Sequence, residues 1–273
     1  MGDRRMTSAT WRIAAASSIG TSHVKQVSVC QDSHACRIMQ DADGSDVVVL
    51  VASDGAGSAT RADAGSDCAC STIVEAVEVC LAKGRRVASF TFDDARDWVD
   101  HVQRAIAYRA EQDGATERDY ACTLLVAIIG TDAAAFLQIG DGAMVATDEI
   151  GEWSWIHWPQ RGDYANSTYF VTEKNACNQM AFDVIARPID DVAVFTDGIE
   201  PLVLHYATKT VHSPFFNAML GPVLASTRSG LDRNLSTSLE KYLASPKVCE
   251  RTDDDKTLIL ATRRNAAATT ESA

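Results

Sequence analysis

Short apolar runs that end in Asp-Gly are the most regular feature of the hydrophobic pattern. The runs are Val47–Ser53, Ala135–Gly140 and Val192–Thr196, and Asp-Gly follows each of them directly. Apolar runs of this length predict strands, and the continuous run at Val47–Ser53 is typical of a strand buried on both faces. A further acidic group, Asp253–Asp255, stands just before the apolar run Thr257–Ala261.

Two long segments follow the helical period instead. Apolar residues recur at helical spacing from 62 to 82, and a glycine follows as an end signal. A second helix is predicted over 93–112, where an aspartate can cap the start and Gly114 marks the end.

The remaining pattern predicts short strands and, later, three further helices. Strands are expected at 11–17, 27–29, 38–40, 122–129, 134–139, 143–147, 153–157, 169–172 and 257–262, and helices at 200–206, 215–225 and 231–243. Glycine-bearing breaks at 130–132 and 142 favour an antiparallel meander. Because strand and helix do not alternate, a Rossmann-like sheet is disfavoured. The order favours an α+β architecture with helices on mixed antiparallel sheets.

The pattern predicts one domain. No long linker interrupts residues 11–263 of the 273-residue chain. Residues 1–10 and the Ala/Thr-rich tail 264–273 are predicted to be disordered, since they offer little apolar surface to bury.

Composition narrows the classes of partner. Hydrophobic residues make up 46% of the chain and charged residues 23%, which is sufficient for a packed core. The net charge of −12 argues against nucleic-acid binding, which requires a basic face, and is compatible with cation binding or with an acidic surface alone. No signal peptide opens the chain, and its apolar runs are too short to span a membrane. We therefore expect a soluble cytoplasmic monomer.

Cysteine usage agrees with that compartment. The chain has eight cysteines, none of them in a Cys-x-x-Cys motif. Several lie in apolar runs, which predicts small buried hydrophobic residues in a reducing environment. A zinc site is the alternative interpretation.

The aspartates at the strand ends form the candidate chemical site. Asp54, Asp141 and Asp197 follow their strands, whereas Asp254 precedes its own. Because the end of one antiparallel strand lies beside the start of its neighbour, all four carboxylates can gather at one edge of the sheets. Such a cluster is unfavourable without a cation, and Mg²⁺ or Mn²⁺ relieves the repulsion by taking oxygen ligands.

The residue types narrow the chemistry further. Asp-Gly is also a common hairpin turn, so a single pair predicts no metal site, whereas the recurrence does. The chain has no P-loop, His-Glu-x-x-His or Gly-x-Ser-x-Gly motif. A carboxylate cluster without an evident nucleophile favours metal-activated water, which two ions about 3.5–4 Å apart can present to phosphorus.

The acidic motifs at the strand ends, taken together, resemble those of the metal-dependent (PPM, or type 2C) protein serine/threonine phosphatases. The resemblance runs from residue 17 to residue 262, with the motifs in the family's order. The matching segments are Cys30–Ser33 (family Asn-Glu-Asp-Ser), Ser53–Ser58 (Ala-Asp-Gly-Met-Gly-Gly), Cys122–Leu124 (Gly-Thr-Thr), Ile139–Gly142 (Gly-Asp-Ser), Thr196–Ile199 (Thr-Asp-Gly-Leu) and Asp254–Thr257 (Asp-Asn-x-Thr). Gly20–His23 and Gly162–Phe170 are most similar to a bacterial subgroup of small stand-alone phosphatases.

The resemblance implies a four-layer αββα sandwich, in which helices flank two central antiparallel β-sheets that hold two or three Mn²⁺ or Mg²⁺ ions. The implied ligands are Asp54, which would bridge two ions, the Gly55 carbonyl, Asp197, Asp254 and, for a third ion, Asp141. The alignment of Thr257 selects Asp254 rather than Asp255. Asp32 would act in catalysis by ordering water at the ions.

One departure from the family concerns the substrate phosphate. The family's phosphate-binding arginine falls at Val27. His23 or Lys25 could bind the phosphate instead, and His23 could also donate a proton to the leaving group. The alternative for His23 is a loop histidine with a structural hydrogen bond. Pro159–Asn175 occupies the place of the family's mobile flap and could gate the substrate.

The leading functional hypothesis is hydrolysis of phosphoserine and phosphothreonine in proteins, opposite a cognate serine/threonine kinase. One alternative is a catalytically weak pseudophosphatase that binds phosphoproteins. The missing arginine favours that alternative, and the carboxylate set argues against it. Another is a two-metal hydrolase of small phosphoesters or nucleotides, although the lack of a basic groove disfavours a nucleic-acid substrate.

Overall fold

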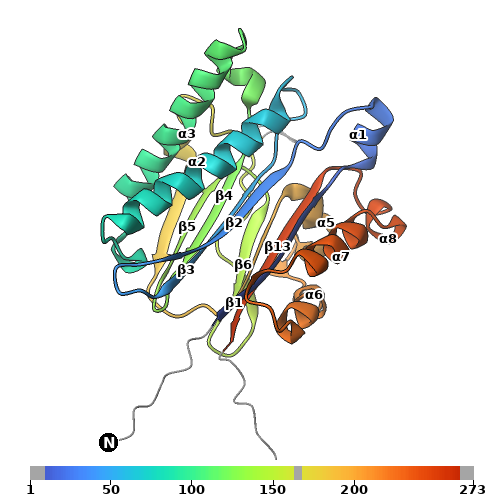
Figure 1. Ribbon diagram of the computed structural model, residues 1–273. Coiled ribbons are helices and arrows are strands. Elements are labelled where there is room, and N and C mark those ends of the chain that lie inside the picture. The colour runs from blue at the N-terminus through green and yellow to red at the C-terminus, as the bar shows by residue number, and fades with distance from the viewer. Residues whose placement is uncertain (1–9, 163–167, 265–273) are drawn as a thin grey trace, which may run out of the picture.

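Two β-sheets lie face to face at the centre of the structure, and helices cover the outer face of each (Figure 1). The computed structural model describes residues 10–162 and 168–264. The expected disorder of 1–10 and 264–273 falls outside these residues except at Thr10 and Arg264. These two residues pair with each other in the first and last strands, so both belong to a sheet.

The sheets are built from strands that are far apart in sequence. The first contains β1 (Thr10–Ser18), β6 (Ala143–Thr147), β7 (Trp153–Trp155), β9 (Asp191–Phe195), β12 (Gly230–Leu231) and β13 (Lys256–Arg264), in the order β12-β1-β13-β9-β6-β7. The second contains β2 (Ser33–Gln40), β3 (Asp46–Ser53), β4 (Leu124–Ile129), β5 (Ala134–Ile139) and β8 (Ala181–Ile185), in the order β2-β3-β4-β5-β8. The strands of both sheets pair antiparallel, as expected, apart from the short parallel contact between β1 and β12.

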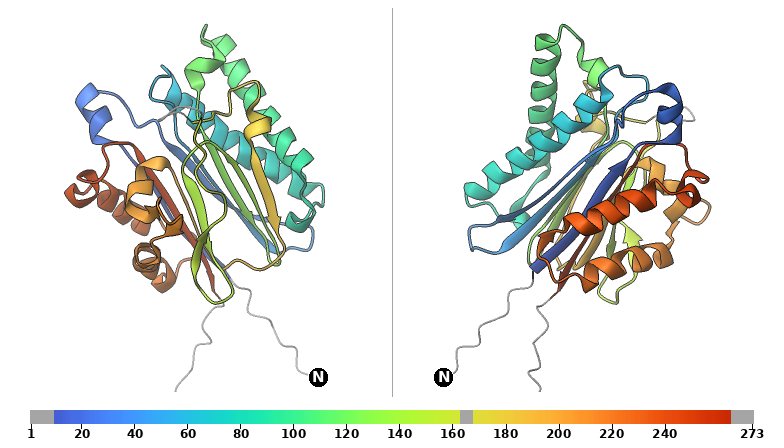
Figure 2. Two further views of the ribbon diagram at one scale, coloured as in Figure 1. Left: turned by 180° about the vertical axis from the view of Figure 1, so that it is seen from behind. Right: turned by 45° about the vertical axis from the view of Figure 1, so that its right-hand side comes forward.

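The helices complete the four predicted layers. They are α1 (Thr21–Gln26), α2 (Ala62–Ala82), α3 (Phe92–Gln112), α4 (Ala176–Gln179), α5 (Glu200–Val203), α6 (Ser213–Ala225), α7 (Arg233–Leu243) and α8 (Pro246–Cys249), and a small hairpin of β10 (Leu204–His205) and β11 (Thr210–Val211) follows α5. Helices α2 and α3 cover the second sheet, and α6 and α7 cover the first (Figure 2). Within the described residues, none of these helices combines the length and the apolar character that crossing a membrane requires.

The continuous apolar run of β3 is explained by its position between two cores. Val49 belongs to the apolar cluster beneath α2 and α3, which also contains Trp98. The next residue, Leu50, belongs to the cluster between the sheets, which also contains Phe136 and Ile259. Since successive side chains of a strand point to opposite faces, a strand that is covered on both faces has no polar positions in its interior.

The segment Gly140–Gly142 does not close the predicted hairpin. It carries the chain from β5 in the second sheet to β6 in the first, so the meander prediction is wrong at this point. Gly140 has φ +99° and Gly142 has φ +79°, values that residues with a Cβ rarely adopt. This crossing brings the edges of the two sheets together.

Two predicted short strands are absent. Val27–Val29 and Tyr169–Thr172 form no strand, and β8 instead provides the edge of the second sheet. The chain forms α1 before Val27, which ends that helix with φ +56° and a side chain that is 93% exposed. Runs of two or three apolar residues are too short for a hydrophobic period to distinguish strand from loop.

The cysteines are free thiols, with Cys70 and Cys122 buried and the other six partly buried. Burial raises the pKa of Cys36 and of Cys122 to about 12. A thiolate, which is the form that binds zinc, is therefore disfavoured at these two positions.

Substitutions at two helical glycines can test how closely the helices pack on neighbouring segments. A Cβ at Gly65 in α2 would lie 2.2 Å from the carbonyl oxygen of Tyr120, whereas a Cβ at Gly221 in α6 would meet no atom within 4 Å. We expect Gly65→Ala to lower the free energy of unfolding by about 1–3 kcal/mol, because overpacking outweighs the gain in helix propensity. The same change at Gly221 should raise it by about 0.5–1 kcal/mol. Urea unfolding of both variants tests this, and equal shifts of the two midpoints would contradict it.

Candidate metal centre

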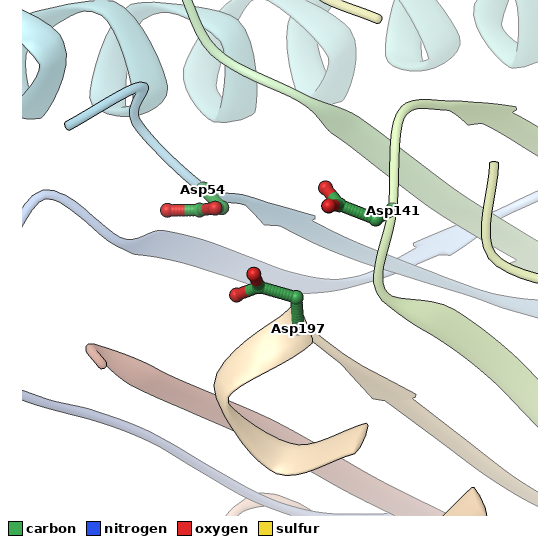
Figure 3. A group of neighbouring side chains, drawn as sticks. All are labelled: Asp54, Asp141 and Asp197. Atoms are coloured by element: carbon green, nitrogen blue, oxygen red, sulfur yellow. The ribbon is translucent and has the colours of Figure 1, made fainter. Parts of the chain in front are cut away.

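Three carboxylates from separate parts of the chain converge at the edge where the sheets meet. One carboxylate oxygen from each of Asp54, Asp141 and Asp197 lies within 4.8 Å of the other two (Figure 3). Asp54 follows β3, Asp141 lies in the link between the sheets, and Asp197 starts the short turn after β9. The structure thus brings together the three strand-end aspartates that the sequence singled out.

The backbone of Asp54 is held by the start of β4. Its N–H donates to Oγ1 of Thr123 (2.9 Å), and its carbonyl oxygen accepts from the N–H of Thr123 (2.8 Å). The hydroxyl of Ser53 donates to the carbonyl oxygen of Thr123 (2.6 Å). Gly55 forms an isolated antiparallel bridge to Cys122. This pairing fixes the Asp54-Gly55 pair against the second sheet.

Glycines allow the other two carboxylates to approach. A Cβ at Gly142 would lie 2.6 Å from the carbonyl oxygen of Phe195, and a Cβ at Gly198 would lie 1.9 Å from the carbonyl oxygen of Asp255. The links that carry Asp141 and Asp197 therefore pack directly on neighbouring backbone. The Asp-Gly pairs are needed here for close packing between segments rather than for hairpin turns.

Asp254 and Asp255 have different surroundings. Asp254 lines a cavity of about 600 Å³ together with Asp141 and Asp197. Asp255 is only 1% exposed, and its two carboxylate oxygens accept from the N–H groups of Gly20 and Gln31, each at 2.6 Å. Asp254 thus faces the cavity, whereas Asp255 fixes two loops by accepting their N–H groups.

Asp32 is buried beside this cluster. Its Oδ2 accepts from the hydroxyls of Thr196 (2.7 Å) and Thr257 (2.8 Å). These threonines flank the acidic motifs of β9 and β13, so Asp32 ties both strands to the segment before β2. Its Oδ1 is buried without a hydrogen-bond partner.

The cluster has the electrostatics of a cation site. Burial raises the pKa of Asp54 well above its ordinary value, and the charges of Asp32 and Asp197 raise it further. Burial and the charges of Asp141 and Asp254 do the same for Asp197. One oxygen of Asp141 and one of Asp197 are buried without a hydrogen-bond partner. Carboxylate oxygens left in this state fit a hard divalent cation such as Mn²⁺ or Mg²⁺.

The residues expected to bind phosphate lie on α1, outside this cavity. The Nδ1 of His23 is 2.9 Å from Oδ2 of Asp255, an ion-pair distance if His23 is protonated, although the angle is not that of a hydrogen bond. Lys25 is exposed on the same helix. Neither side chain lines the cavity that Asp141, Asp197 and Asp254 share.

Three charged residues near the carboxylate cluster were not predicted from the sequence. Glu200 is 4% exposed and accepts from the N–H of Gly142 (2.8 Å) and from the hydroxyl of Tyr206. Its position three residues after Asp197 is the one feature of the sequence that could have indicated Glu200. Lys256 is fully buried and donates to the carbonyl oxygen of Asp254 (2.9 Å). Arg161 lines the cavity but lies in a polar segment that gave no signal.

The predicted flap, Pro159–Asn175, is described only in part, because 163–167 fall outside the described residues. The described part before them contains Arg161, which lines the cavity. The part after them contains Phe170, which packs on the alanine cluster around Ala56 and Ala121. The described parts on either side therefore lie near the carboxylate cluster, while gating of the substrate stays a prediction.

Comparison with known proteins agrees with this geometry. The family model described as "Protein phosphatase 2C" matches residues 19–244. Serine/threonine-protein phosphatase 3 of Escherichia coli (strain K12) is 33% identical over 253 residues, which is 92% of this chain and 98% of that protein.

Solved structures share the fold at much lower identity. The catalytic domain of the serine/threonine phosphatase PstP, crystallised with two manganese ions, has a TM-score of 0.56 at 13% identity and covers 94% of this chain and 99% of its own. Stp1 from Staphylococcus aureus has a TM-score of 0.55 at 13% identity, covering 96% of this chain and 98% of its own. The extent of the family match and the identity to the E. coli protein bear out the resemblance read from the motifs: this chain belongs to the protein phosphatase 2C family.

Proposed function

We propose that this chain is a protein serine/threonine phosphatase that depends on Mn²⁺ or Mg²⁺. The observation that carries the proposal is the convergence of Asp54, Asp141 and Asp197 within 4.8 Å, with buried carboxylate oxygens left unpaired. The ions would be held by Asp54, the Gly55 carbonyl, Asp197 and Asp254, with Asp141 for a third. When bound, such ions supply an activated water and neutralise charge on the phosphate.

The chain's own residues would prepare this chemistry. Asp32 is fixed through Oδ2 by Thr196 and Thr257, which leaves its Oδ1 free to accept a hydrogen bond from water beside Asp54. Glu200 holds the Asp141 link through the N–H of Gly142. These contacts preorganise the carboxylates before substrate arrives.

Phosphoproteins are the substrate class that the family implies. The complete carboxylate set argues against a pseudophosphatase, and no feature of the described residues favours small phosphoesters or nucleotides over a phosphoprotein. The same proposal has four further parts: action opposite a cognate kinase, a monomeric state, a cytoplasmic location and a single domain spanning 11–263. The capture of the substrate phosphate is the step in which this chain departs from its family, because Val27 carries no charge.

The first test is turnover. Wild-type protein with Mn²⁺ should hydrolyse p-nitrophenyl phosphate and a phosphothreonine peptide, and a chelator should stop both reactions. Asp197→Asn should lower the rate by on the order of 100-fold, because a ligand and its charge are lost. Asp97→Asn, an exposed change on α3, is the matched control. Folded wild-type protein without activity in any divalent metal would refute the enzyme assignment.

The second test separates the neighbouring aspartates. Asp254→Asn should weaken Mn²⁺ binding about tenfold or more, measured by calorimetry. Asp255→Asn should leave Mn²⁺ affinity nearly unchanged but lower the free energy of unfolding by about 1–3 kcal/mol, since an amide oxygen replaces only one of two acceptors. The reverse pattern would make Asp255 the ligand.

The third test uses pH. Folded-state pKa values of Asp54, Asp141 and Asp197 lie above the unfolded value of about 4. The metal-free folded state therefore binds more protons than the unfolded state, and its stability falls as pH rises above that value. We expect the metal-free unfolding midpoint to be higher at pH 5 than at pH 8. Mn²⁺ should reduce the difference, and so should Asp197→Asn. A metal-free midpoint that rises with pH would contradict this.

A further inference from the structure

The cavity beside the carboxylates contains a positive charge that no sequence motif indicated. Besides Asp141, Asp197 and Asp254, it is lined by Arg161, Glu200, Pro201, Leu204 and Tyr206. Among the described residues that line it, Arg161 is the one cation. A substrate phosphate that entered this cavity would meet Arg161 and not His23 or Lys25.

The Arg161 guanidinium is positioned without being locked. Its carbon lies 4.7 Å from the centre of the Tyr206 ring. A terminal nitrogen is 4.0 Å from Oε2 of Glu200, at the outer limit of an ion pair. The Arg161 side chain is 61% exposed, whereas that of Glu200 is 5% exposed. A long ion pair at this exposure holds the guanidinium weakly, so a better anion can displace the contact.

The ring beneath Arg161 is held by a row of aromatic side chains. Tyr206 meets Trp158 edge-on at 5.6 Å between ring centres, and Trp158 meets Trp155 edge-on at 5.7 Å. The indole N–H of Trp155 donates to the carbonyl oxygen of Lys209 (2.9 Å). The hydroxyl of Tyr206 donates to Glu200, which binds the Asp141 link. Arg161 therefore rests on a support that is connected to the carboxylate cluster.

We infer that Arg161 binds the phosphate of the substrate and supplies the charge that Val27 lacks. The inference rests on the proposed phosphatase function and names a substrate-binding residue for it. A guanidinium presents its N–H groups as a planar fork that matches two phosphate oxygens, and its cation–π contact with Tyr206 keeps it beside the cavity. His23 is less suited, because its Nδ1 already faces Asp255.

The experiment compares Arg161→Met and Arg161→Lys with the wild type, all with Mn²⁺. With a phosphothreonine peptide, Arg161→Met should raise KM about tenfold or more with a smaller change in kcat. The KM of Arg161→Lys should lie between those of the wild type and Arg161→Met. Binding of inorganic phosphate, measured by calorimetry, should weaken by a similar factor. The Mn²⁺ concentration that gives half-maximal activity should stay unchanged. Arg228→Met removes an exposed arginine at the opposite end of the first sheet and should change none of these values.

Other outcomes would overturn the inference. One is unchanged KM and phosphate affinity in Arg161→Met, together with a raised KM in His23→Ala or Lys25→Met. Another is tighter Mn²⁺ binding in Arg161→Met with unchanged phosphate affinity, which would make Arg161 a counter-charge to Glu200 and Asp141. Calorimetry with phosphate needs no turnover, so it tests Arg161 even if the wild type proves inactive and the proposed function fails.

Discussion

The main physical constraint on this structure is the mutual repulsion of carboxylates that are gathered and partly buried at one edge of the sheets. Asp54, Asp141 and Asp197 come within 4.8 Å of one another, and burial has already made each negative charge costly. Such an arrangement opposes folding unless cations or protons offset it. Other parts of the fold therefore have to offset this cost, and the apolar clusters packed between and outside the two sheets do so.

Backbone contact is the means by which the carboxylates are held against this repulsion. Thr123 forms hydrogen bonds with both the N–H and the carbonyl oxygen of Asp54, and Gly198 packs on the carbonyl of Asp255. Asp255 itself accepts from two N–H groups of distant loops. Interactions of this kind leave little freedom for the side chains to separate. Hydrogen bonds and close packing thus fix the backbone that carries the carboxylates, which precise coordination requires.

The side of the cavity that would receive phosphate is built differently. Arg161 lies against Tyr206 at high exposure, and its ion-pair contact with Glu200 is long. A cationic side chain that binds an incoming anion has to release its earlier partner, whereas the ligands of a metal ion have to stay in place. The contrast between a partly buried carboxylate cluster and an exposed guanidinium matches these two tasks. In the proposed function, Arg161 takes the place of the charge that is missing at Val27.

The sequence by itself determined the strands that precede each Asp-Gly, the helices α2 and α3, and the three aspartates that converge at the sheet edge. Each of these is encoded by a local pattern of apolar residues or by a short motif. Tertiary structure alone decided that Gly140–Gly142 joins two sheets instead of closing a hairpin, and that Arg161 lines the cavity that Asp141, Asp197 and Asp254 share. Each of these depends on contacts between segments far apart in the chain, and a local pattern holds no information on such contacts.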